Sequence, residues 1–253
     1  MAERLSDADV LLEDLTPEQR DAVTTSATPL CIVAGAGSGK TRVLTRRIAW
    51  QAATGTIDPR RVLAVTFTRR AAGELRRRTR ALGLRDDVAA GTFHSIALAI
   101  LRNHWKDSGR RAPELLDRRM SFLARQHRNL DRASIADIDG EIGWARARLV
   151  TPDRYADAAK AARRRPGRSL SFVADIYGQY EEAKRKRKLV DFDDLLALCH
   201  ATMTQDTRFA EAQRWRHRHV LVDEFQDVNP LQFALLQSWL GPESSLVVVG
   251  DPN

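Results

Sequence analysis

The sequence predicts an α/β fold in which helices flank a mostly parallel sheet and a helical insertion divides the sheet into two parts. Two observations support this prediction. Short apolar runs rich in β-branched residues recur along the chain, each followed by a turn or helix signal, as expected for buried parallel strands. Between about residues 102 and 189 no such run occurs, and apolar residues follow helical spacing instead. The predicted strands cover residues 30–34, 62–67, 89–93, 220–223 and 246–250.

The predicted insertion is recognised by its composition and periodicity. Ala, Arg, Leu and Glu predominate, and apolar residues such as Ile176 and Tyr180 recur at the spacing of one helix face. Loop signals occur at residues 109–113 and 166–167. We therefore expect the first part of an α/β domain, then a helical insertion, then the second part of the same domain, at residues 1–105, 106–189 and 190–253.

The composition favours a globular protein that binds a polyanion. With 253 residues and 43% hydrophobic content the chain can bury one or two cores, and its net charge is +8. Residues 61–80 carry seven Arg against the single acidic Glu74, and residues 151–190 carry eleven basic against five acidic side chains. Charged helix faces exposed to solvent are the alternative interpretation of each stretch. Charge alone does not separate nucleic acid from an anionic membrane surface.

Several classes of protein are disfavoured. No apolar run approaches the roughly 20 residues that span a bilayer, and the first 15 residues are acidic rather than signal-like. We therefore expect a cytoplasmic protein without a membrane partner. Cys31 and Cys199 have no neighbouring His or Cys at metal-ligand spacing, so we interpret them as reduced thiols and expect no zinc site.

Residues 30–41 have the pattern of a phosphate-binding loop between a strand and a helix. Glycines allow successive backbone N–H groups to face one anion, and the N-terminus of the following helix adds positive charge. Lys40 is placed to reach the outer phosphates, and the Thr41 hydroxyl to bind Mg²⁺. Ala34 replaces the first Gly of the usual pattern, which requires an ordinary strand-end conformation there. The predicted nucleotide-binding residues in this segment are Ala34, Gly35, Ala36, Gly37, Ser38, Gly39, Lys40, Thr41 and Arg42.

A second apolar strand ends directly at two adjacent carboxylates, Asp223 and Glu224. We expect this strand to run beside the loop strand, so that Asp223 holds Mg²⁺ and Glu224 orients or deprotonates the attacking water. With Lys40 these two residues form the predicted catalytic set. Capping of the next helix, at Asn229 and Pro230, is the alternative role for Asp227.

The order and spacing of these segments resemble those of the UvrD/Rep/PcrA-like superfamily 1 helicases from Leu15 onward. That resemblance implies a RecA-like phosphate-loop fold with an insertion called 1B. The segment Leu15-Thr16-Pro17-Glu18-Gln19 is similar to the family's Q motif, in which the Gln reads the adenine edge; Gln19 therefore implies ATP rather than GTP. An amide that donates and accepts suits the adenine N6 and N7. A helix-surface role after the Thr16 cap is the alternative for Gln19.

The resemblance also implies contacts with single-stranded DNA. The segment Thr66-Phe67-Thr68-Arg69 is similar to the family's Thr-Phe-Thr-Asn segment, with Arg69 in place of the Asn. An aromatic face such as that of Phe67 stacks on bases, and arginines meet phosphates; core filling is the alternative for Phe67. Phe93 and His94 lie in the next family segment, with a hydrogen-bonded structural role as the alternative for His94. The predicted DNA-binding residues are Thr66, Phe67, Thr68, Arg69, Phe93, His94 and Phe192.

Three further segments complete the resemblance. Phe192 lies where the insertion returns to the motor core, among Asp191, Asp193 and Asp194, which we interpret as helix-capping or structural residues. Gln226 has the position of a residue that couples the ATP and DNA sites. Residues 247–253 are similar to the start of the family's third motif, so we expect a fragment that stops before the second RecA-like domain.

By this resemblance the chain is the front part of a 3′–5′ DNA helicase or translocase that uses ATP and Mg²⁺, with single-stranded DNA and a single-strand/duplex junction as partners. The family's second motor domain supplies arginines to the ATP site, and an arginine of this kind contributes about 10³ to 10⁵ in rate. We therefore expect little turnover unless another chain supplies that domain. The basic cluster of the insertion is predicted to contact duplex DNA, through Arg163, Arg164, Arg165, Arg168 and residues 184–188.

Two alternatives from other functional classes remain open at this point. The chain can be a phosphate-loop ATPase without a DNA role, which loss of DNA binding would support. It can also be a non-catalytic DNA-binding module with a vestigial loop, which loss of ATP binding would support.

Overall fold

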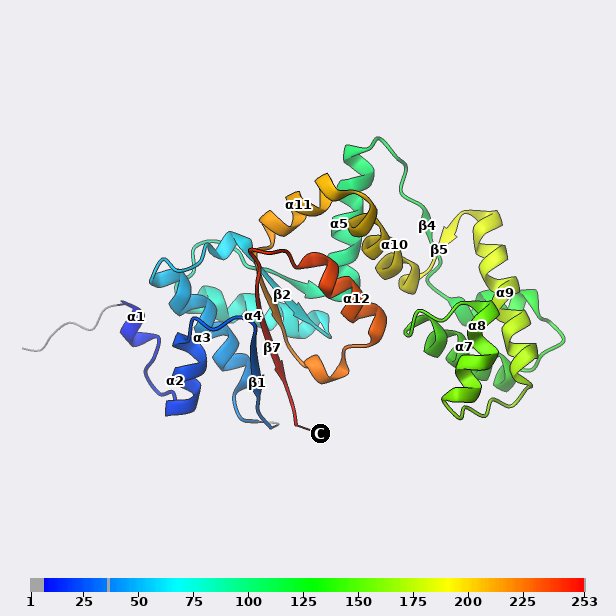
Figure 1. Cartoon of the computed structure of the whole chain (residues 1–253), viewed down its shortest axis with the longest axis horizontal. Coiled ribbons are helices and arrows are strands. Elements are labelled where there is room, and N and C mark those ends of the chain that lie inside the picture. The colour runs from blue at the N-terminus through cyan, green and yellow to red at the C-terminus, as the bar shows by residue number, and fades with distance from the viewer. Residues whose placement is uncertain (1–6, 36, 253) are drawn as a thin grey trace, which may run out of the picture. The chain divides into compact units, whose positions relative to one another are not determined.

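The computed structural model, which describes residues 7–35 and 37–252, contains a five-stranded sheet in which all strands are parallel (Figure 1). The strand order is β1-β7-β6-β2-β3. Each of the five strands predicted from apolar runs is present, within one residue at either end, and the mostly parallel α/β class is confirmed. The strands are β1 (Leu30–Val33), β2 (Val62–Thr66), β3 (Ala89–Thr92), β6 (His219–Val222) and β7 (Ser245–Gly250).

One expectation about the sheet is wrong. The strand that ends at the carboxylate pair does not run beside the loop strand, because β7 lies between β1 and β6. Leu30 pairs with Val247 on one side of β7, and Leu246 pairs with Val220 on its other side. The carboxyl ends of all three strands still meet at one edge of the sheet. The residue that follows β7, Asp251, therefore lies between the phosphate loop and the carboxylate pair in the sheet order.

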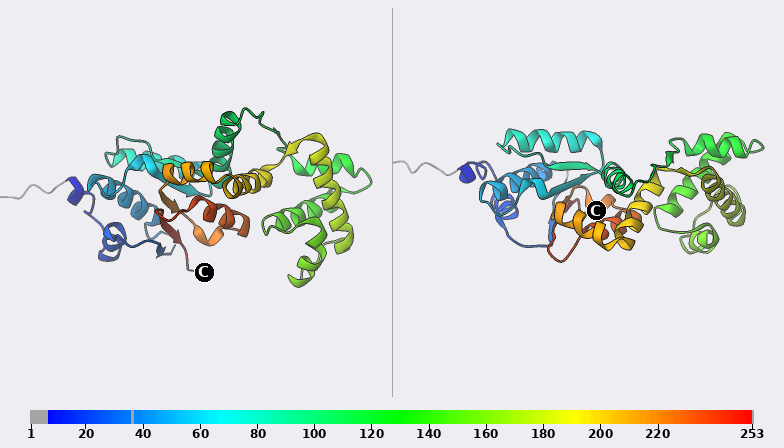
Figure 2. Two further views of the ribbon diagram at one scale, coloured as in Figure 1. Left: turned by 45° about the horizontal axis from the view of Figure 1, so that its top comes forward. Right: turned by 90° about the horizontal axis from the view of Figure 1, so that it is seen from above.

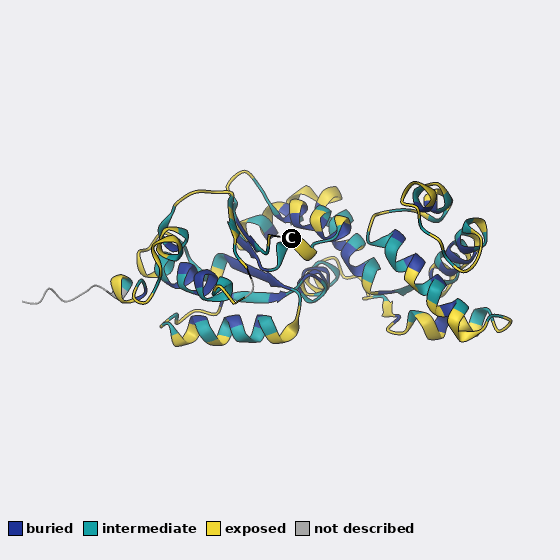
Figure 3. Ribbon diagram, turned by 90° about the horizontal axis from the view of Figure 1, so that it is seen from below, coloured by how far each residue is buried: buried dark blue, intermediate teal, exposed yellow. Residues whose placement is uncertain are grey.

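Two helices cover one face of the sheet. Leu44 and Ile48 of α3 and Leu75 of α4 pack with strand residues that include Val62 and Val249 in a single buried cluster. Figure 2 shows helices on both sides of the sheet, and Figure 3 shows strands buried between them. Burial on both faces explains why β2 is apolar at almost every position. The helices of this face are α3 (Lys40–Ala53) and α4 (Arg69–Ala81).

The opposite side of the sheet is built around aromatic residues. Phe93, the first residue of α5, stacks on Trp239 at the end of α12, with ring centroids 5.8 Å apart. Phe67 approaches the edge of Phe93 at 6.2 Å. Both Phe93 and Trp239 are 2% exposed. The helices next to the later strands are α5 (Phe93–Asp107), α11 (Thr207–Arg216) and α12 (Pro230–Trp239). Two short 3₁₀ helices, η1 (Pro59–Arg61) and η2 (Phe225–Asp227), also belong to this part of the chain.

The N-terminal helices precede the loop strand. Thr16 caps α2 through a reciprocal capping box with Gln19, in which each side chain accepts from the other's backbone N–H. This cap fixes where the Gln19 side chain leaves the helix. The two helices are α1 (Asp7–Val10) and α2 (Pro17–Thr24).

The middle of the chain is helical, as predicted, with its own core. Tyr155, Val173 and Tyr180 are each 0% exposed within this core, and both loop signals fall between elements. One feature was not predicted: residues on either side of the helices form a two-stranded parallel sheet, β4 (Glu114–Leu115) with β5 (Leu189–Val190). The helices are α6 (Arg119–Gln126), α7 (Arg132–Arg146), α8 (Pro152–Ala161), α9 (Leu170–Arg187) and α10 (Phe192–Gln205).

The chain divides into two compact units. The unit that holds the five-stranded sheet comprises residues 1–99, 202–228 and 236–253, and the helical unit comprises residues 100–201 and 229–235. The helical unit begins at residue 100 rather than 106, ends at 201 rather than 189 and includes residues 229–235, so the three-segment domain assignment stays a prediction. Across the described residues, no helix is long and apolar enough to cross a membrane.

Candidate functional site

The phosphate loop connects β1 to α3 through two glycines in the left-handed region. Gly37 has φ of 78° and Gly39 has φ of 88°, conformations that a side chain disfavours. Ala34, by contrast, continues the strand, since its N–H donates to the Gly250 carbonyl at 3.0 Å and its φ is not positive. The requirement that Ala34 keep an ordinary strand-end conformation is therefore met. Ala36 lies outside the described residues.

Lys40, the first residue of α3, is the charged centre of the loop. Its Nζ donates to the Ala34 carbonyl at 3.2 Å, lies 3.9 Å from Glu224 and forms an ion pair with Asp251. The Lys40 side chain is 9% exposed, so these contacts are screened only partly by water. Three protein oxygen groups thus lie around the ammonium that we predicted to reach the phosphates.

Thr41 and Arg42, the other two predicted residues at the start of α3, have different surroundings. Thr41 is the second residue of α3 and is half-buried, which is compatible with a hydroxyl oxygen that coordinates a metal ion. Arg42 points elsewhere, because its guanidinium donates to the Asp14 carbonyl at 2.8 Å. This contact ties α3 to the N-terminal segment, and the nucleotide-binding role of Arg42 stays a prediction.

Asp223 and Glu224 follow β6 directly and differ in exposure. Asp223 is 7% exposed, and its backbone N–H donates to the Val65 carbonyl at 2.9 Å, which extends the pairing of β6 with β2. Glu224 has a left-handed φ of 51°, and its side chain is 41% exposed. Burial, and then the neighbouring Glu224, raise the pKa of Asp223 against the opposing effect of Lys40.

The Asp223 carboxylate suits a divalent cation. Within the described part of the chain no ion pair holds this carboxylate, and one of its oxygens accepts from the Glu224 N–H at 3.1 Å. A buried anion that lacks a paired cation is costly, which the raised pKa reflects. Mg²⁺ bound by Asp223 and the Thr41 hydroxyl, with phosphate oxygens and water, would offset this cost.

We expect Asp223→Asn to separate metal binding from stability. The variant should lower Mg²⁺ affinity in the presence of ATP by at least about 10-fold to 100-fold, the effect of losing even an outer metal contact. Without Mg²⁺ its melting temperature should rise, because the raised pKa means that folding disfavours the charged form. This gain is largest at neutral pH and vanishes as the pH falls through the raised pKa, where wild-type Asp223 becomes protonated.

Thermal unfolding without Mg²⁺ from about pH 3.5, below the ordinary Asp pKa of about 3.9, to pH 8 measures the stability effect, and titration of Mg²⁺ in the presence of ATP measures the metal affinity. Asp227→Asn is the matched control, since Asp227 is exposed and lies four residues away. A melting temperature that falls at neutral pH in Asp223→Asn, while Asp227→Asn is unchanged, would contradict our account of Asp223.

Gln226 connects the carboxylate pair to the end of β7. Its Nε2 donates to Glu224 at 2.9 Å, and its Oε1 accepts from the Asp251 N–H at 3.0 Å. A Cβ at Gly250 would lie 2.7 Å from the same Oε1, so glycine is needed for this approach. Lys40, Glu224, Gln226 and Asp251 thus form one continuous polar network.

A cavity of about 650 Å³ lies beside the loop, between α2 and β1. Gln19, Ser38, Lys40 and Val43 are among its lining residues. The Gln19 amide is already engaged, because its Nε2 donates to the Ser38 carbonyl at 2.9 Å while its Oε1 serves the capping box. Gln19 therefore connects the helix start, the phosphate loop and a cavity large enough for a nucleoside.

The Thr66–Arg69 segment lies at the same edge of the sheet. Thr66 is buried, and its hydroxyl donates to the Thr68 carbonyl at 3.0 Å, while Thr68 caps α4 by accepting from the Ala71 N–H at 3.0 Å. Phe67 is half-buried and Arg69 is exposed. Phe67, Thr68 and Arg69 are therefore accessible to a ligand, whereas the buried Thr66 shapes the turn, and the DNA-binding role of the segment stays a prediction.

Phe93 and His94, the next predicted DNA-binding residues, also differ in burial. Phe93 is buried between Phe67 and Trp239, which gives its ring a packing role and argues against direct DNA contact. His94 is half-buried in the first turn of α5. Phe93 begins α5 directly after β3, and its ring is enclosed by Phe67 and Trp239.

A comparison with known protein families identifies the family of this chain. A family model described as the UvrD/REP helicase N-terminal domain matches residues 15–253. The chain belongs to this family. Its five-stranded parallel sheet flanked by helices is accordingly the RecA-like domain of a UvrD/REP protein, as the resemblance implied.

Individual UvrD/REP relatives cover nearly the whole chain. The ATP-dependent DNA helicase UvrD2 of Mycobacterium tuberculosis is 41% identical over 97% of this chain and 37% of the relative. The ATP-dependent DNA helicase UvrD1 of the same organism is 35% identical over 98% of this chain and 34% of the relative. The ATP-dependent DNA helicase PcrA of Bacillus subtilis is 35% identical over 96% and 33%. The chain thus spans about a third of the length of these relatives.

In the helical unit of this UvrD/REP chain, the predicted site residues are only partly available to a ligand. Phe192 is 44% exposed. The predicted basic surface needs correction, because Lys184 is 2% exposed and ion-paired, and Arg164 binds Glu141 and lies over the Trp144 ring. Their charges are used inside the unit. Arg163, Arg165 and Arg168 remain exposed.

Sequence reasoning missed Asp251 as a site residue. Its carboxylate forms an ion pair with the loop lysine, Lys40. A signal was present, because a carboxylate directly after an apolar strand is the same pattern that identified Asp223. Trp239, which supports Phe93, carried no such signal, since an apolar helix end is typical of any core.

Proposed function

We propose that this chain is the ATP-binding front portion of an ATP-dependent 3′–5′ DNA helicase or translocase. The observation that carries the proposal is the convergence of Lys40, Asp223 and Glu224 at the carboxyl edge of one parallel sheet, beside a phosphate loop. Ligands bind at this edge in open α/β sheets. The names of the UvrD/REP relatives support ATP-dependent action on DNA and do not favour an ATPase without a DNA role.

The proposed nucleotide is Mg·ATP. The loop N–H groups and Lys40 hold the phosphates, and Asp223 and Thr41 hold the metal, which supplies charge neutralisation for the transferred phosphoryl group. The cavity beside Gln19 receives the nucleoside. To bind adenine, the Gln19 amide must replace its hydrogen bond with Thr16 or with Ser38 by one to the base. Adenine binding would therefore also change the hydrogen bonds that connect α2 to the phosphate loop.

The proposed reaction is attack of water on the γ-phosphate without a covalent intermediate. Glu224 is positioned to orient or deprotonate that water, because it is the partly exposed carboxylate of the pair and lies 3.9 Å from Lys40. Gln226 joins Glu224 to the backbone after β7. A change at the phosphates can therefore reach the end of β7 through two hydrogen bonds.

The proposed second substrate is single-stranded DNA, near its junction with duplex. Phe67 offers a half-buried ring at the sheet edge, Arg69 a phosphate contact, and Phe192 an exposed ring in the helical unit. Coupling to movement requires a second RecA-like domain, from the same or another chain. A cytoplasmic location belongs to this proposal.

Binding measurements on the 253-residue chain test the proposal directly. We expect Mg·ATP to bind, measured with a fluorescent analogue, and a dT oligonucleotide to bind with an affinity that falls steeply with salt. ATP binding without any oligonucleotide binding would support an ATPase without a DNA role. Oligonucleotide binding without ATP binding would support a non-catalytic DNA-binding module.

A further inference from the structure

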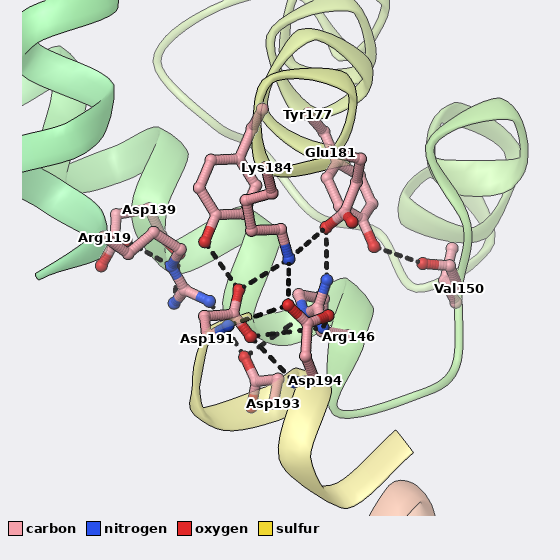
Figure 4. Close-up of polar contacts among 11 residues, drawn as sticks. Arg119, Asp139, Arg146, Val150, Tyr177, Glu181, Lys184, Asp191, Asp193 and Asp194 are labelled. Atoms are coloured by element: carbon pink, nitrogen blue, oxygen red, sulfur yellow. Dashed lines mark hydrogen bonds and ion pairs between the residues drawn. The ribbon is translucent and has the colours of Figure 1, made fainter. Parts of the chain in front are cut away.

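Phe192 is held between two carboxylates that are themselves fixed by buried cations. It is the first residue of α10 and is 44% exposed, whereas Asp191 before it is 3% exposed. Cations from α6, α7 and α9 converge on Asp191, Asp193 and Asp194, as Figure 4 shows. Of the four residues 191–194, Phe192 is the one that carries no carboxylate, and it lies between residues that the ionic cluster holds.

Arg146, the last residue of α7, is the centre of the cluster. Its guanidinium forms ion pairs with Glu181 and Asp194, and it lies 3.4 Å from Asp191 and 3.5 Å from Asp193. Its side chain is only 9% exposed. One arginine therefore holds all three carboxylates of the segment and attaches them to α9 through Glu181.

Lys184 holds the same segment from α9. Its Nζ lies 2.9 Å from Asp191, 2.7 Å from Asp194 and 3.2 Å from Glu181. The Tyr180 hydroxyl donates to Asp191 at 2.6 Å. Burial alone would raise the pKa of Asp191, but Arg146 and Lys184 hold it well below its usual range. Asp191 is consequently charged and locked in place.

The backbone of the segment is fixed as well. The Asp194 N–H donates to Asp191 and the Asp191 N–H donates to Asp194, each at 2.8 Å, which makes a reciprocal cap at the start of α10. Arg119 of α6 bridges Asp193 at 3.0 Å and Asp139 at 2.6 Å. Little freedom is left to the backbone on either side of Phe192.

An arrangement of this kind is poorly explained by stability alone. Replacing a buried ion cluster by apolar residues of similar volume is often neutral or stabilising, because desolvation opposes the attraction between charges. What charged, multiply bonded groups provide is a defined geometry. A ring held in its binding orientation loses less conformational entropy when it meets a ligand.

We propose that Arg146 and Lys184 are positioning residues that hold the first turn of α10 so that Phe192 presents its ring to a base of single-stranded DNA. The inference rests on the proposed function, which assigns Phe192 a base contact. It adds that affinity at this subsite depends on two buried cations that do not touch the DNA.

The test is a double-mutant cycle in the 253-residue chain, with a dT oligonucleotide that carries one 2-aminopurine. Phe192→Ala should weaken binding by about 5-fold to 150-fold, the range for loss of one stacked base. Arg146→Met should weaken it by several-fold and reduce the stacking-dependent quenching of 2-aminopurine. On the Phe192→Ala background, Arg146→Met should have no further effect. Arg146→Lys should recover part of the loss.

Arg185→Met is the matched control for charge. Arg185 is an exposed residue of α9 whose side chain pairs with Glu182 outside the cluster, so the control removes one positive charge without touching Phe192. It should change affinity by less than Arg146→Met and leave the quenching unchanged. Lys184→Met provides a second variant if Arg146→Met does not fold, and Mg·ATP affinity should be unaltered in every folded variant.

The outcomes distinguish two failures. If Phe192→Ala leaves DNA affinity unchanged, the base contact assigned under the proposed function is wrong, and the positioning role is wrong with it. If Phe192→Ala weakens binding but folded Arg146→Met and Lys184→Met do not, only the positioning role is overturned. Equal effects of Arg146→Met with and without Phe192 would likewise overturn it.

Discussion

Replacing Lys40 by alanine should lower Mg·ATP affinity by about 100-fold. Hydrogen bonds to a charged group contribute about 1.5–3 kcal/mol, and Lys40 is 9% exposed, where screening is weak. The variant also leaves Asp251 and Glu224 without the ammonium that faces them, so two carboxylates would repel the phosphates. Titration with a fluorescent ATP analogue measures the loss.

A second substitution separates attraction from repulsion. In Lys40→Ala/Asp251→Asn, part of the affinity should return, because the carboxylate that paired with Lys40 is neutral. In the wild-type background, Asp251→Asn alone should tighten Mg·ATP binding several-fold, since ATP no longer competes with Asp251 for the ammonium. Unchanged ATP affinity in Lys40→Ala would refute the phosphate-loop assignment itself.

The phosphate loop and the carboxylate pair could be predicted because their signals are local. A turn that needs left-handed φ at Gly37 and Gly39 requires glycine whatever surrounds it. A carboxylate directly after an apolar strand, as at Asp223, must lie at the sheet edge. The helix start at Lys40 and the cap at Thr16 are likewise set by neighbouring residues.

The order of the strands could not be predicted in this way. All five strands are apolar, so nothing local distinguishes a neighbour of β1 from a strand one place further away. Long-range packing decides it, and the result places Asp251 rather than Asp223 in contact with Lys40. A local pattern thus identified the chemistry of this edge but not which carboxylate meets the lysine.

The burial of individual side chains also could not be predicted from local patterns. Lys184 belongs to a run of basic residues that is typical of an exposed surface, yet it is almost fully buried because Asp191 and Asp194 compensate its charge from the next helix. Phe93, which we predicted to contact DNA, is 2% exposed and packs against Phe67. Partners distant in sequence changed the role of each residue.

Glu224→Gln should separate ATP binding from hydrolysis. Loss of a general base costs about 10²-fold to 10⁴-fold in rate, whereas the glutamine keeps the size of the side chain and can still accept a hydrogen bond from Gln226. Mg·ATP affinity should be kept or slightly increased, because a negative charge 3.9 Å from Lys40 is removed. Phosphate release at saturating ATP, with single-stranded DNA and with a second RecA-like domain supplied in the same or another chain, measures the rate.

Asp227→Asn is the control for the loss of one negative charge in the same segment, and it should hydrolyse ATP at the wild-type rate. If Glu224→Gln retained that rate, the base would have to be another group, and the buried Asp223 with its raised pKa would be the remaining carboxylate of the pair. Because Asp223 is also the proposed metal ligand, the two roles would then coincide in one residue. Mg²⁺ dependence and pH dependence of the rate would have to change together, whereas the present assignment requires that Glu224→Gln alter the pH profile and leave the Mg²⁺ requirement intact.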